Sequence, residues 1–259
     1  MAVGDLFALT GKVALVTGGS RGIGLAMAQA LGEMGARVAL VARKEDELAA
    51  ATARLHALGI EAHAIAADLS QPAAIAPIVD AAEQALGPVD ILLNNAGNTW
   101  AAPAESYPDE AWRRVMSLNV DAQFYLAREV ARRMMIPRRR GKIINVASIA
   151  GLFANPPAWQ MGTIAYNTSK AALIQMTRAL ATEWGRHDIN VNAICPGFFP
   201  TRMSRGALDR IEASVLEMTP LGRLGSDQDL MGVVVFLASE ASRHVTGQAL
   251  VVDGGCTLA

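Results

Sequence analysis

One stretch of the sequence decides the fold: residues 12–24, which read KVALVTGGSRGIG. Its first part, Lys12–Thr17, is a short run rich in Val, as expected of a strand buried in a parallel sheet. A glycine-rich turn, Gly18–Gly24, then leads into a helical pattern over Leu25–Met34. Glycines let the backbone approach a pyrophosphate, and a helix N-terminus supplies free N–H groups and a partial positive charge. The stretch therefore predicts a phosphate-binding loop, although a tight turn alone would also explain its glycines.

The second predicted strand, Arg37–Ala42, ends where many NAD-binding proteins place an Asp or Glu against the ribose hydroxyls. This chain has Arg43 and Lys44 there instead. An acid would repel a 2′-phosphate, whereas two cations attract it, and Arg21 in the glycine loop is placed to close the same pocket. We therefore expect NADP(H) as the cofactor rather than NAD(H). The alternative is that Arg43 and Lys44 only begin a solvated helix.

Short apolar runs alternate with helical patterns along the rest of the chain. This alternation predicts an α/β Rossmann fold, with a doubly wound parallel sheet of seven strands and helices on both faces. We found no linker or repeat that would divide residues 1–259 into two domains. The further strands are expected at residues 62–67, 89–93, 142–147, 189–195 and 248–253, and the further helices at residues 45–58, 73–86, 109–117, 119–135, 163–185 and 224–238.

Polar and small residues stand where several of these strands end, and in an open parallel sheet the ligand crevice lies at that edge. Asp68 follows the third strand and is placed to accept a hydrogen bond from an adenine amino group, and Ser70 is predicted to cap the next helix. Asn119 is expected either to cap a helix or to hold a water inside the site. The other strand-end residues are Leu69, Asn94, Asn95, Ala96, Gly97, Ser148, Pro196 and Gly197.

Tyr166 and Lys170 are four residues apart on a predicted helix, so their side chains point the same way. A phenol titrates near pH 10, too high for a base at neutral pH, and an ammonium within about 4–6 Å favours the phenolate and lowers that pKa. The pair is therefore a candidate acid/base group. Taken alone, a Tyr and a Lys at this spacing are more often a solvated helix face.

The composition bounds the remaining possibilities. The chain has 259 residues, 52% of them hydrophobic, and a net charge of −1, which gives no basis for bulk nucleic-acid binding. It has no apolar run of membrane-spanning length and no signal-peptide pattern at its start. Two cysteines provide no disulfide framework, and four scattered histidines show no metal-ligand spacing. We expect a cytoplasmic protein with a small-molecule substrate, no metal, no membrane partner and no nucleic-acid partner.

Five motifs occur in one order: Thr17-Gly18-x-x-x-Gly22-x-Gly24, Asn94-Asn95-Ala96-Gly97, Ser148, Tyr166-x-x-x-Lys170 and Pro196-Gly197. Together they resemble the short-chain dehydrogenase/reductase family, and the resemblance extends from Leu9 to Gly255. It implies that Tyr166 is the general acid or base, that Lys170 lowers its pKa, and that Ser148 donates to the substrate oxygen. Asn119 would hold a water that links Lys170 to solvent, and a homotetramer is implied. Cofactor contacts are expected from Gly18, Ser20, Arg21, Gly22, Ile23, Gly24, Arg43, Lys44, Asp68, Leu69, Asn95, Ala96, Gly97, Tyr166, Lys170, Pro196, Gly197 and Thr201.

Two segments depart from the family pattern. Ser148 and Tyr166 are separated by a few extra residues, around 153–162, which we interpret either as an apolar wall beside the substrate or as a capped surface loop. The second segment follows Pro196-Gly197 and carries two aromatic residues, Phe198 and Phe199. The resemblance implies a mobile substrate lid there, over residues 198–220. Arg202 or Arg205 would meet an anionic group on the substrate, unless both only decorate a solvated lid helix.

Several functions fit these residues. The expected one is NADP(H)-dependent hydride transfer between a ketone and a secondary alcohol, most similar to the 3-oxoacyl reductases. A sugar-acid or polyol dehydrogenase of the gluconate 5-dehydrogenase type is the alternative, since Asn98, Thr99, Trp100, Asn155 and Gln160 offer polar groups. A cyclic alcohol or hydroxysteroid is a third substrate class. A non-catalytic dinucleotide-binding protein is a remote alternative, because Ser148, Tyr166 and Lys170 are all present.

Overall fold

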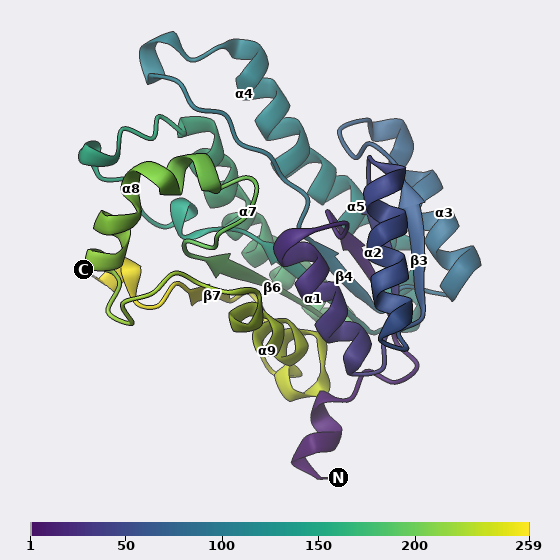
Figure 1. The fold of residues 1–259 in the computed structure, drawn as a ribbon. Coiled ribbons are helices and arrows are strands. Elements are labelled where there is room, and N and C mark those ends of the chain that lie inside the picture. The colour runs from purple at the N-terminus through teal and green to yellow at the C-terminus, as the bar shows by residue number, and fades with distance from the viewer. Residues whose placement is uncertain (1, 259) are drawn as a thin grey trace.

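The computed structural model describes residues 2–258, and in them seven parallel strands form one sheet of order β3-β2-β1-β4-β5-β6-β7 (Figure 1). The strands begin and end close to where the apolar runs predicted, and the second matches its predicted bounds. The doubly wound seven-stranded prediction is confirmed. The strands are β1 Val13–Thr17, β2 Arg37–Ala42, β3 Ala62–Ala66, β4 Ile91–Asn94, β5 Gly141–Val146, β6 Ile189–Pro196 and β7 Ala249–Val252.

Helices cover both faces of the sheet because alternate strand residues point to opposite sides. In β1, Ala14 and Val16 pack into the core shared with α1, α2 and α9, which lie in front of the sheet in Figure 1. Val13 and Leu15 pack on the other side, with α3, α5 and the end of α7. The helices are α1 Gly22–Glu33, α2 Glu45–Ala57, α3 Ile75–Leu86, α4 Asp109–Met116, α5 Ala122–Val130, α6 Ile136–Arg138, α7 Ile164–Trp184, α8 Arg205–Met218 and α9 Asp227–Ala238.

The order of the strands reverses between β1 and β4, which are paired in register from Ala14 and Ile91. The chain therefore crosses over to one side of β1 for β2 and β3, and to the other side from β4 onwards. At such a point the loops after the two strands separate and leave a crevice at the carboxyl ends. The glycine loop after β1 and the Asn94–Gly97 turn after β4 flank this crevice.

Two predictions about helix boundaries were wrong. The predicted break between residues 117 and 119 does not exist, because π-helical turns at Ser117–Asp121 and Ala131–Met135 join α4, α5 and α6 into one run. Ser70 does not cap the next helix: a short 3-10 turn begins it at Pro72, with Gln71 at the cap position. The Ser70 backbone and hydroxyl instead donate to the Asp68 carboxylate, at 3.0 and 2.8 Å.

Within residues 2–258, no helix combines the length and apolar character that a bilayer crossing needs. The same residues contain no group of three His, Cys, Asp or Glu side chains arranged to hold a metal ion.

Candidate active site

The glycine loop joins the end of β1 to the first turn of α1. Gly18 has a φ of 64°, and a Cβ at Gly24 would collide with the Gly18 carbonyl oxygen, so this close approach requires glycine. Among the described residues, no side chain caps the first turn of α1. The N–H groups of Gly22, Ile23 and Gly24 therefore have no partner from a cap or from the helix itself. A loop of this kind fits a pyrophosphate.

Hydrogen bonds from the Thr17 and Asn95 side chains tie the loop after β1 to the turn after β4. The Thr17 hydroxyl accepts from the N–H groups of Asn95 and Ala96, at 2.9 and 3.0 Å. The Asn95 amide donates to the carbonyl oxygens of Thr17 and Gly18, at 3.0 and 3.2 Å. A Cβ at Gly97 would lie 3.2 Å from the Asn119 oxygen and 3.7 Å from the Lys170 Nζ. Gly97 therefore packs closely against two of the predicted catalytic residues, Asn119 and Lys170.

Ser148, Tyr166 and Lys170 come together at this edge. Ser148 follows β5 and is 8% exposed, and its hydroxyl accepts from the Ala150 N–H at 3.1 Å. Lys170 is 4% exposed, and its Nζ donates to the Val146 carbonyl oxygen at 2.7 Å. The Nζ lies 5.5 Å from the centre of the Tyr166 ring. Burial lowers the pKa of Lys170 to about 8.

The acidity of Tyr166 differs from the sequence expectation, in which Lys170 lowers its pKa. In the structure burial raises the pKa of Tyr166, and the hydrogen bond with the Ser148 side chain offsets this only in part. The physical reason is that the Lys170 ammonium binds a backbone carbonyl group rather than the phenol. Tyr166 is consequently a protonated phenol at neutral pH, ready to donate a hydrogen bond or a proton.

Asn119 is fully buried in the π-helical turn, so it is not a helix cap. Its oxygen accepts from the Asn98 N–H at 2.8 Å, and its amide donates to the Asn98 carbonyl oxygen at 2.9 Å and to the Ser169 hydroxyl at 3.0 Å. Asn119 thus fixes the backbone that follows the Asn94–Gly97 turn to the helix that carries Tyr166. The water expected beside it stays a prediction.

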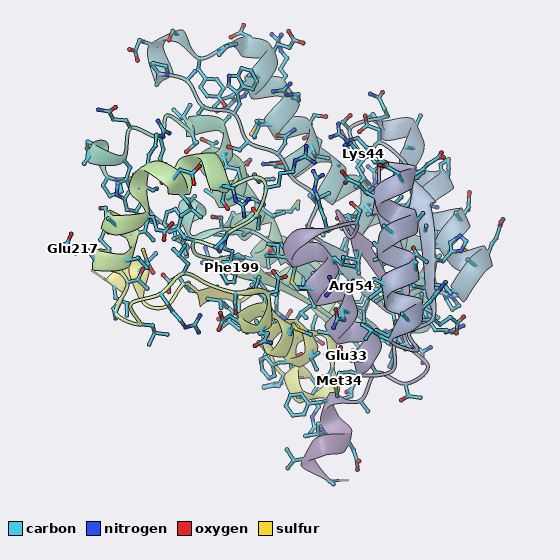
Figure 2. The ribbon with its side chains drawn as sticks, in the orientation of Figure 1. Glu33, Met34, Lys44, Arg54, Phe199 and Glu217 are labelled. Atoms are coloured by element: carbon cyan, nitrogen blue, oxygen red, sulfur yellow. The ribbon has the colours of Figure 1, made fainter. Side chains whose placement is uncertain are left out.

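The cations expected to bind a 2′-phosphate lie at the beginning of α2, where Figure 2 labels Lys44. Lys44 Nζ is 3.1 Å from Glu47, and Arg21 Nη1 is 2.7 and 2.9 Å from its two carboxylate oxygens. Arg202, which was expected to meet an anionic substrate group, lies 3.7 Å from the same carboxylate. Arg43 is exposed at the end of β2. Glu47 is not among the predicted site residues, although it follows Lys44 by three residues in the first turn of α2, a spacing at which opposite charges pair.

The other predicted cofactor contacts lie around the same crevice. Asp68 and Leu69 follow β3, where the Asp68 carboxylate turns towards Ser70 and Leu69 is 6% exposed. Thr201 approaches the glycine loop, with its methyl group 3.9 Å from where a Cβ on Gly22 would lie. Pro196 ends β6, and the Gly197 N–H donates to the Val252 carbonyl oxygen on β7 at 2.9 Å.

The insertion at 153–162 packs against the segment after β6, which we call the α8 segment (residues 198–220). Trp159 is 4% exposed, and its indole N–H donates to the Ser214 hydroxyl on α8 at 2.9 Å. Its ring meets Phe198 and Phe153 edge to face, with centroids 5.4 and 6.4 Å apart. Ile211 and Val215 of α8 complete the apolar cluster around Phe153, Trp159 and Phe198. Trp159 is therefore an apolar contact between the insertion and the α8 segment, and a wall beside the substrate stays a prediction.

Two further contacts anchor the insertion to the rest of the crevice. The Asn155 amide donates to the Thr163 hydroxyl at 2.9 Å, and that hydroxyl donates to Asn167 on α7 at 2.9 Å. The Ala102 N–H donates to the Gly162 carbonyl oxygen at 3.0 Å. The insertion therefore bridges α7, α8 and the loop after β4.

Comparison with known proteins agrees with this geometry. The family model described as "Enoyl-(Acyl carrier protein) reductase" matches residues 18–257. Gluconate 5-dehydrogenase of Gluconobacter oxydans is 42% identical, with 98% of each chain covered. The rhamnolipid-biosynthesis 3-oxoacyl-[acyl-carrier-protein] reductase of Pseudomonas aeruginosa is 41% identical, with 96% of this chain and 97% of the relative covered.

Solved structures agree over the whole chain as well. A gluconate 5-dehydrogenase of Burkholderia cenocepacia, in complex with NADP and tartrate, superimposes with a TM-score of 0.93 at 36% identity and full coverage of both chains. A short-chain type dehydrogenase/reductase of Mycobacterium marinum gives a TM-score of 0.94 at 37% identity, again with full coverage of both. From the motifs, the fold and these matches, we conclude that the chain belongs to the short-chain dehydrogenase/reductase family of oxidoreductases.

Proposed function

We propose that the protein transfers a hydride between NADP(H) and a ketone or secondary alcohol. The observation that carries the proposal is the placement of Ser148, Tyr166 and buried Lys170 at the sheet edge beside the glycine loop. A carbonyl oxygen that becomes an alkoxide needs two nearby donors, and a hydroxyl and a phenol supply them. The cofactor, when bound, supplies or accepts the hydride.

Tyr166, Ser148 and Lys170 have different roles in the proton transfer that accompanies the hydride transfer. In reduction, the Tyr166 hydroxyl gives its proton to the carbonyl oxygen while the Ser148 hydroxyl donates a hydrogen bond to the same atom. In oxidation, Tyr166 takes the proton back, and the nearby Lys170 ammonium stabilises its phenolate. The raised pKa of Tyr166, caused by burial, favours the protonated phenol that the reductive direction requires. Asn119 helps to position Tyr166, because it holds Ser169 on the same helix and the Asn98 backbone beside it.

The preference for NADP(H) over NAD(H) rests on the cations around the end of β2. Arg43 and Lys44 stand where an acid would bind the ribose hydroxyls of NAD, and the Arg21 guanidinium reaches the same place from the glycine loop, where it pairs with Glu47. The NADP in the Burkholderia gluconate 5-dehydrogenase supports this assignment. Gly18, Ser20, Gly22, Ile23 and Gly24 would hold the pyrophosphate, and the remaining contacts would come from Asp68, Leu69, Asn95, Ala96, Gly97, Pro196, Gly197 and Thr201.

For the substrate, we favour a 3-oxoacyl thioester. Two apolar side chains close in sequence to Ser148 and Tyr166 are exposed: Leu152 is 45% exposed and lies four residues after Ser148, and Ile164 is 44% exposed and lies two residues before Tyr166. Two of the amide N–H groups that would recognise a polyol already have partners, since Asn98 donates to the Arg114 carbonyl oxygen and Asn155 to Thr163. The Asn98 side-chain oxygen has no partner among the described residues and is the polar group that favours a polyol. A sugar acid is the second candidate, supported by the 42% identity to gluconate 5-dehydrogenase.

The proposal extends to the whole chain. We infer one catalytic domain over residues 1–259, with the α8 segment as the substrate lid and Arg202 and Arg205 exposed on it. We also infer a homotetramer, supported by the exposed Leu250 and Val251 on β7, the last strand at one edge of the sheet. A cytoplasmic location is supported by the free thiols of Cys195 and Cys256.

The loss of NADPH absorbance tests the function, with acetoacetyl-CoA and 5-ketogluconate as parallel substrates and NADH as the parallel cofactor. We expect NADPH-selective turnover of acetoacetyl-CoA that a Tyr166→Phe variant lacks. Turnover of 5-ketogluconate alone would move the assignment to the sugar acids. Equal turnover with NADH would overturn the cofactor assignment.

A further inference from the structure

Glu47 holds the cations that the proposed cofactor needs. Its carboxylate binds Arg21 from the glycine loop at 2.7 and 2.9 Å, and Lys44 from the end of β2 at 3.1 Å. Arg202 approaches from the α8 segment to 3.7 Å. Glu47 therefore faces cations from three separate parts of the chain.

The carboxylate is also held in its charged form. The Lys44 hydrogen bond lowers the pKa of Glu47, and the Arg21 charge acts in the same direction. The Glu47 side chain is 23% exposed, whereas Arg21 and Lys44 are 53% and 57% exposed. Glu47 is thus more buried than the two cations, and the cations are accessible to a ligand from solvent.

A 2′-phosphate and the Glu47 carboxylate compete for the same two cations. Both are anions with oxygen acceptors, and both pair with guanidinium and ammonium groups through charge-assisted hydrogen bonds. Arg21 contacts Glu47 through Nη1 alone and Lys44 through one Nζ contact, so both cations keep N–H groups for a phosphate, but Glu47 neutralises part of their charge and holds their orientation. The two anions also repel one another across a few ångströms.

We propose that Glu47 is an internal competitor of the cofactor 2′-phosphate and thereby sets the NADPH/NADH selectivity. This inference rests on the proposed use of NADP(H). The 2′-phosphate of NADPH meets cations whose charge Glu47 partly neutralises and is repelled by the Glu47 carboxylate, whereas NADH has no phosphate at this position. Glu47 is a specificity-determining residue that weakens the preferred cofactor, and it makes no contact with the reacting atoms.

The test is Glu47→Gln, which keeps the shape of the side chain and removes its charge. The equilibrium binding of NADPH and NADH is measured by titration calorimetry without substrate, at low and at physiological ionic strength. We expect NADPH to bind about threefold to tenfold more tightly than to the wild type at low salt, and NADH to change less than about twofold. The gain should shrink at higher salt because exposed charges are screened.

Glu45→Gln is the matched control. Glu45 lies in the same first turn of α2, and its substitution changes the net charge and the helix dipole interaction equally. Among the described residues, no ion pair involves Glu45. Its substitution should leave the ratio of NADPH to NADH affinity at the wild-type value.

Three outcomes would overturn the inference: an unchanged NADPH affinity in Glu47→Gln, a weaker one, or an equal gain in Glu45→Gln. A weaker affinity would mean that Glu47 serves mainly to hold Arg21 and Lys44 ready for the phosphate. Failure of the underlying function looks different, because the wild type itself would then bind NADPH no better than NADH.

Discussion

Two groups of side chains contact the α8 segment, and they differ in charge and in exposure to solvent. On the cofactor side, Arg202 at the beginning of the segment approaches Glu47, in a group whose cations are more than half exposed. On the substrate side, the middle of α8 packs against Trp159, which is 4% exposed and makes one hydrogen bond. The first contact is ionic and open to solvent, and the second is apolar and dry.

This difference indicates which contact can exchange partners. Exposed ion pairs add little net stability, because water and salt solvate the separated charges nearly as well. A ligand that carries a phosphate can therefore take over the cations at small cost. A buried aromatic side chain loses its packing when it moves and gains nothing comparable from solvent. We expect the cofactor side to adapt to its ligand and the substrate side to hold its shape.

The largest expected effect comes from a residue that belongs to neither group. Tyr166→Phe removes only the proton donor, so turnover should fall by about 10²–10⁴-fold. NADPH affinity should stay at the wild-type value, and stability should fall only by the loss of the hydrogen bond with Ser148, about 1 kcal/mol. Steady-state kinetics, a binding titration and a thermal melt make the comparison. Wild-type turnover in this variant would mean that another group supplies the proton.

Trp159→Ala should break the apolar contact. The loss of a buried Trp costs about 3–5 kcal/mol, and here the cost falls on the docking of α8. We expect faster proteolysis within residues 200–220 and a higher KM for the ketone, with an unchanged Kd for NADPH. Limited proteolysis and kinetics measure this.

Ser214→Ala is the matched control for that variant. It removes the hydrogen bond from the indole and leaves the ring packed, so it should cost only about 1 kcal/mol. Equal effects of the two variants would show that the hydrogen bond, and not the aromatic packing, holds the segment.

Arg43→Asp tests the cofactor side. An acid at the end of β2 would repel a 2′-phosphate and accept hydrogen bonds from the ribose hydroxyls of NADH. The ratio of kcat/KM for NADPH to that for NADH should fall by about tenfold, which corresponds to about 1.4 kcal/mol. An unchanged ratio would show that Arg21 and Lys44 bind the phosphate without Arg43.

The smallest effect concerns stability and pH. Burial lowers the pKa of Lys170 to about 8 in the folded chain, from 10.5 for a free side chain. Between these values the unfolded chain binds more protons, so the contribution of Lys170 to the unfolding free energy rises with pH, by about 1 kcal/mol from pH 8 to 9. Urea unfolding at both pH values should show this rise in the wild type and lose it in Lys170→Met.

The measurement should stay at or below pH 9, because a second buried group, the Cys195 thiol, makes the unfolding free energy fall as the pH rises. Burial raises the pKa of Cys195 to about 11, from 9.0. Here the folded chain binds more protons above pH 9, so this thiol makes stability fall as the pH rises further. An equal slope in Lys170→Met and the wild type below pH 9 would contradict the assignment to Lys170.

The sequence predicted the sheet well because buried parallel strands are continuous apolar runs that need no knowledge of their neighbours. The bounds of β2 follow from its residues alone, and so does the glycine loop after β1. Features that depend on distant contacts were missed. The Arg21–Glu47 pair joins residues 26 apart in sequence, and Trp159 donates to a hydroxyl 55 residues away.

Local patterns also failed where the environment reverses their usual effect. The Tyr166–Lys170 spacing is correct for a helix, yet burial and the Val146 carbonyl group decide the protonation of both side chains. Ser70 is a residue type that often caps helices, but its N–H and hydroxyl donate to the Asp68 carboxylate instead. A π-helical turn has no recognisable sequence pattern here, so the continuous run from α4 to α6 could not be anticipated.

The position of Trp159 gives the protein its own optical reporter. The chain has four tryptophans, and Trp100 and Trp112 are 42% and 36% exposed, so their emission already reflects contact with water. An indole sealed in an apolar pocket emits at shorter wavelengths than one in water. Release of α8 in a variant such as Ser214→Ala would therefore appear as a red shift in the native fluorescence, and the docking of this segment can be followed in real time without any attached dye.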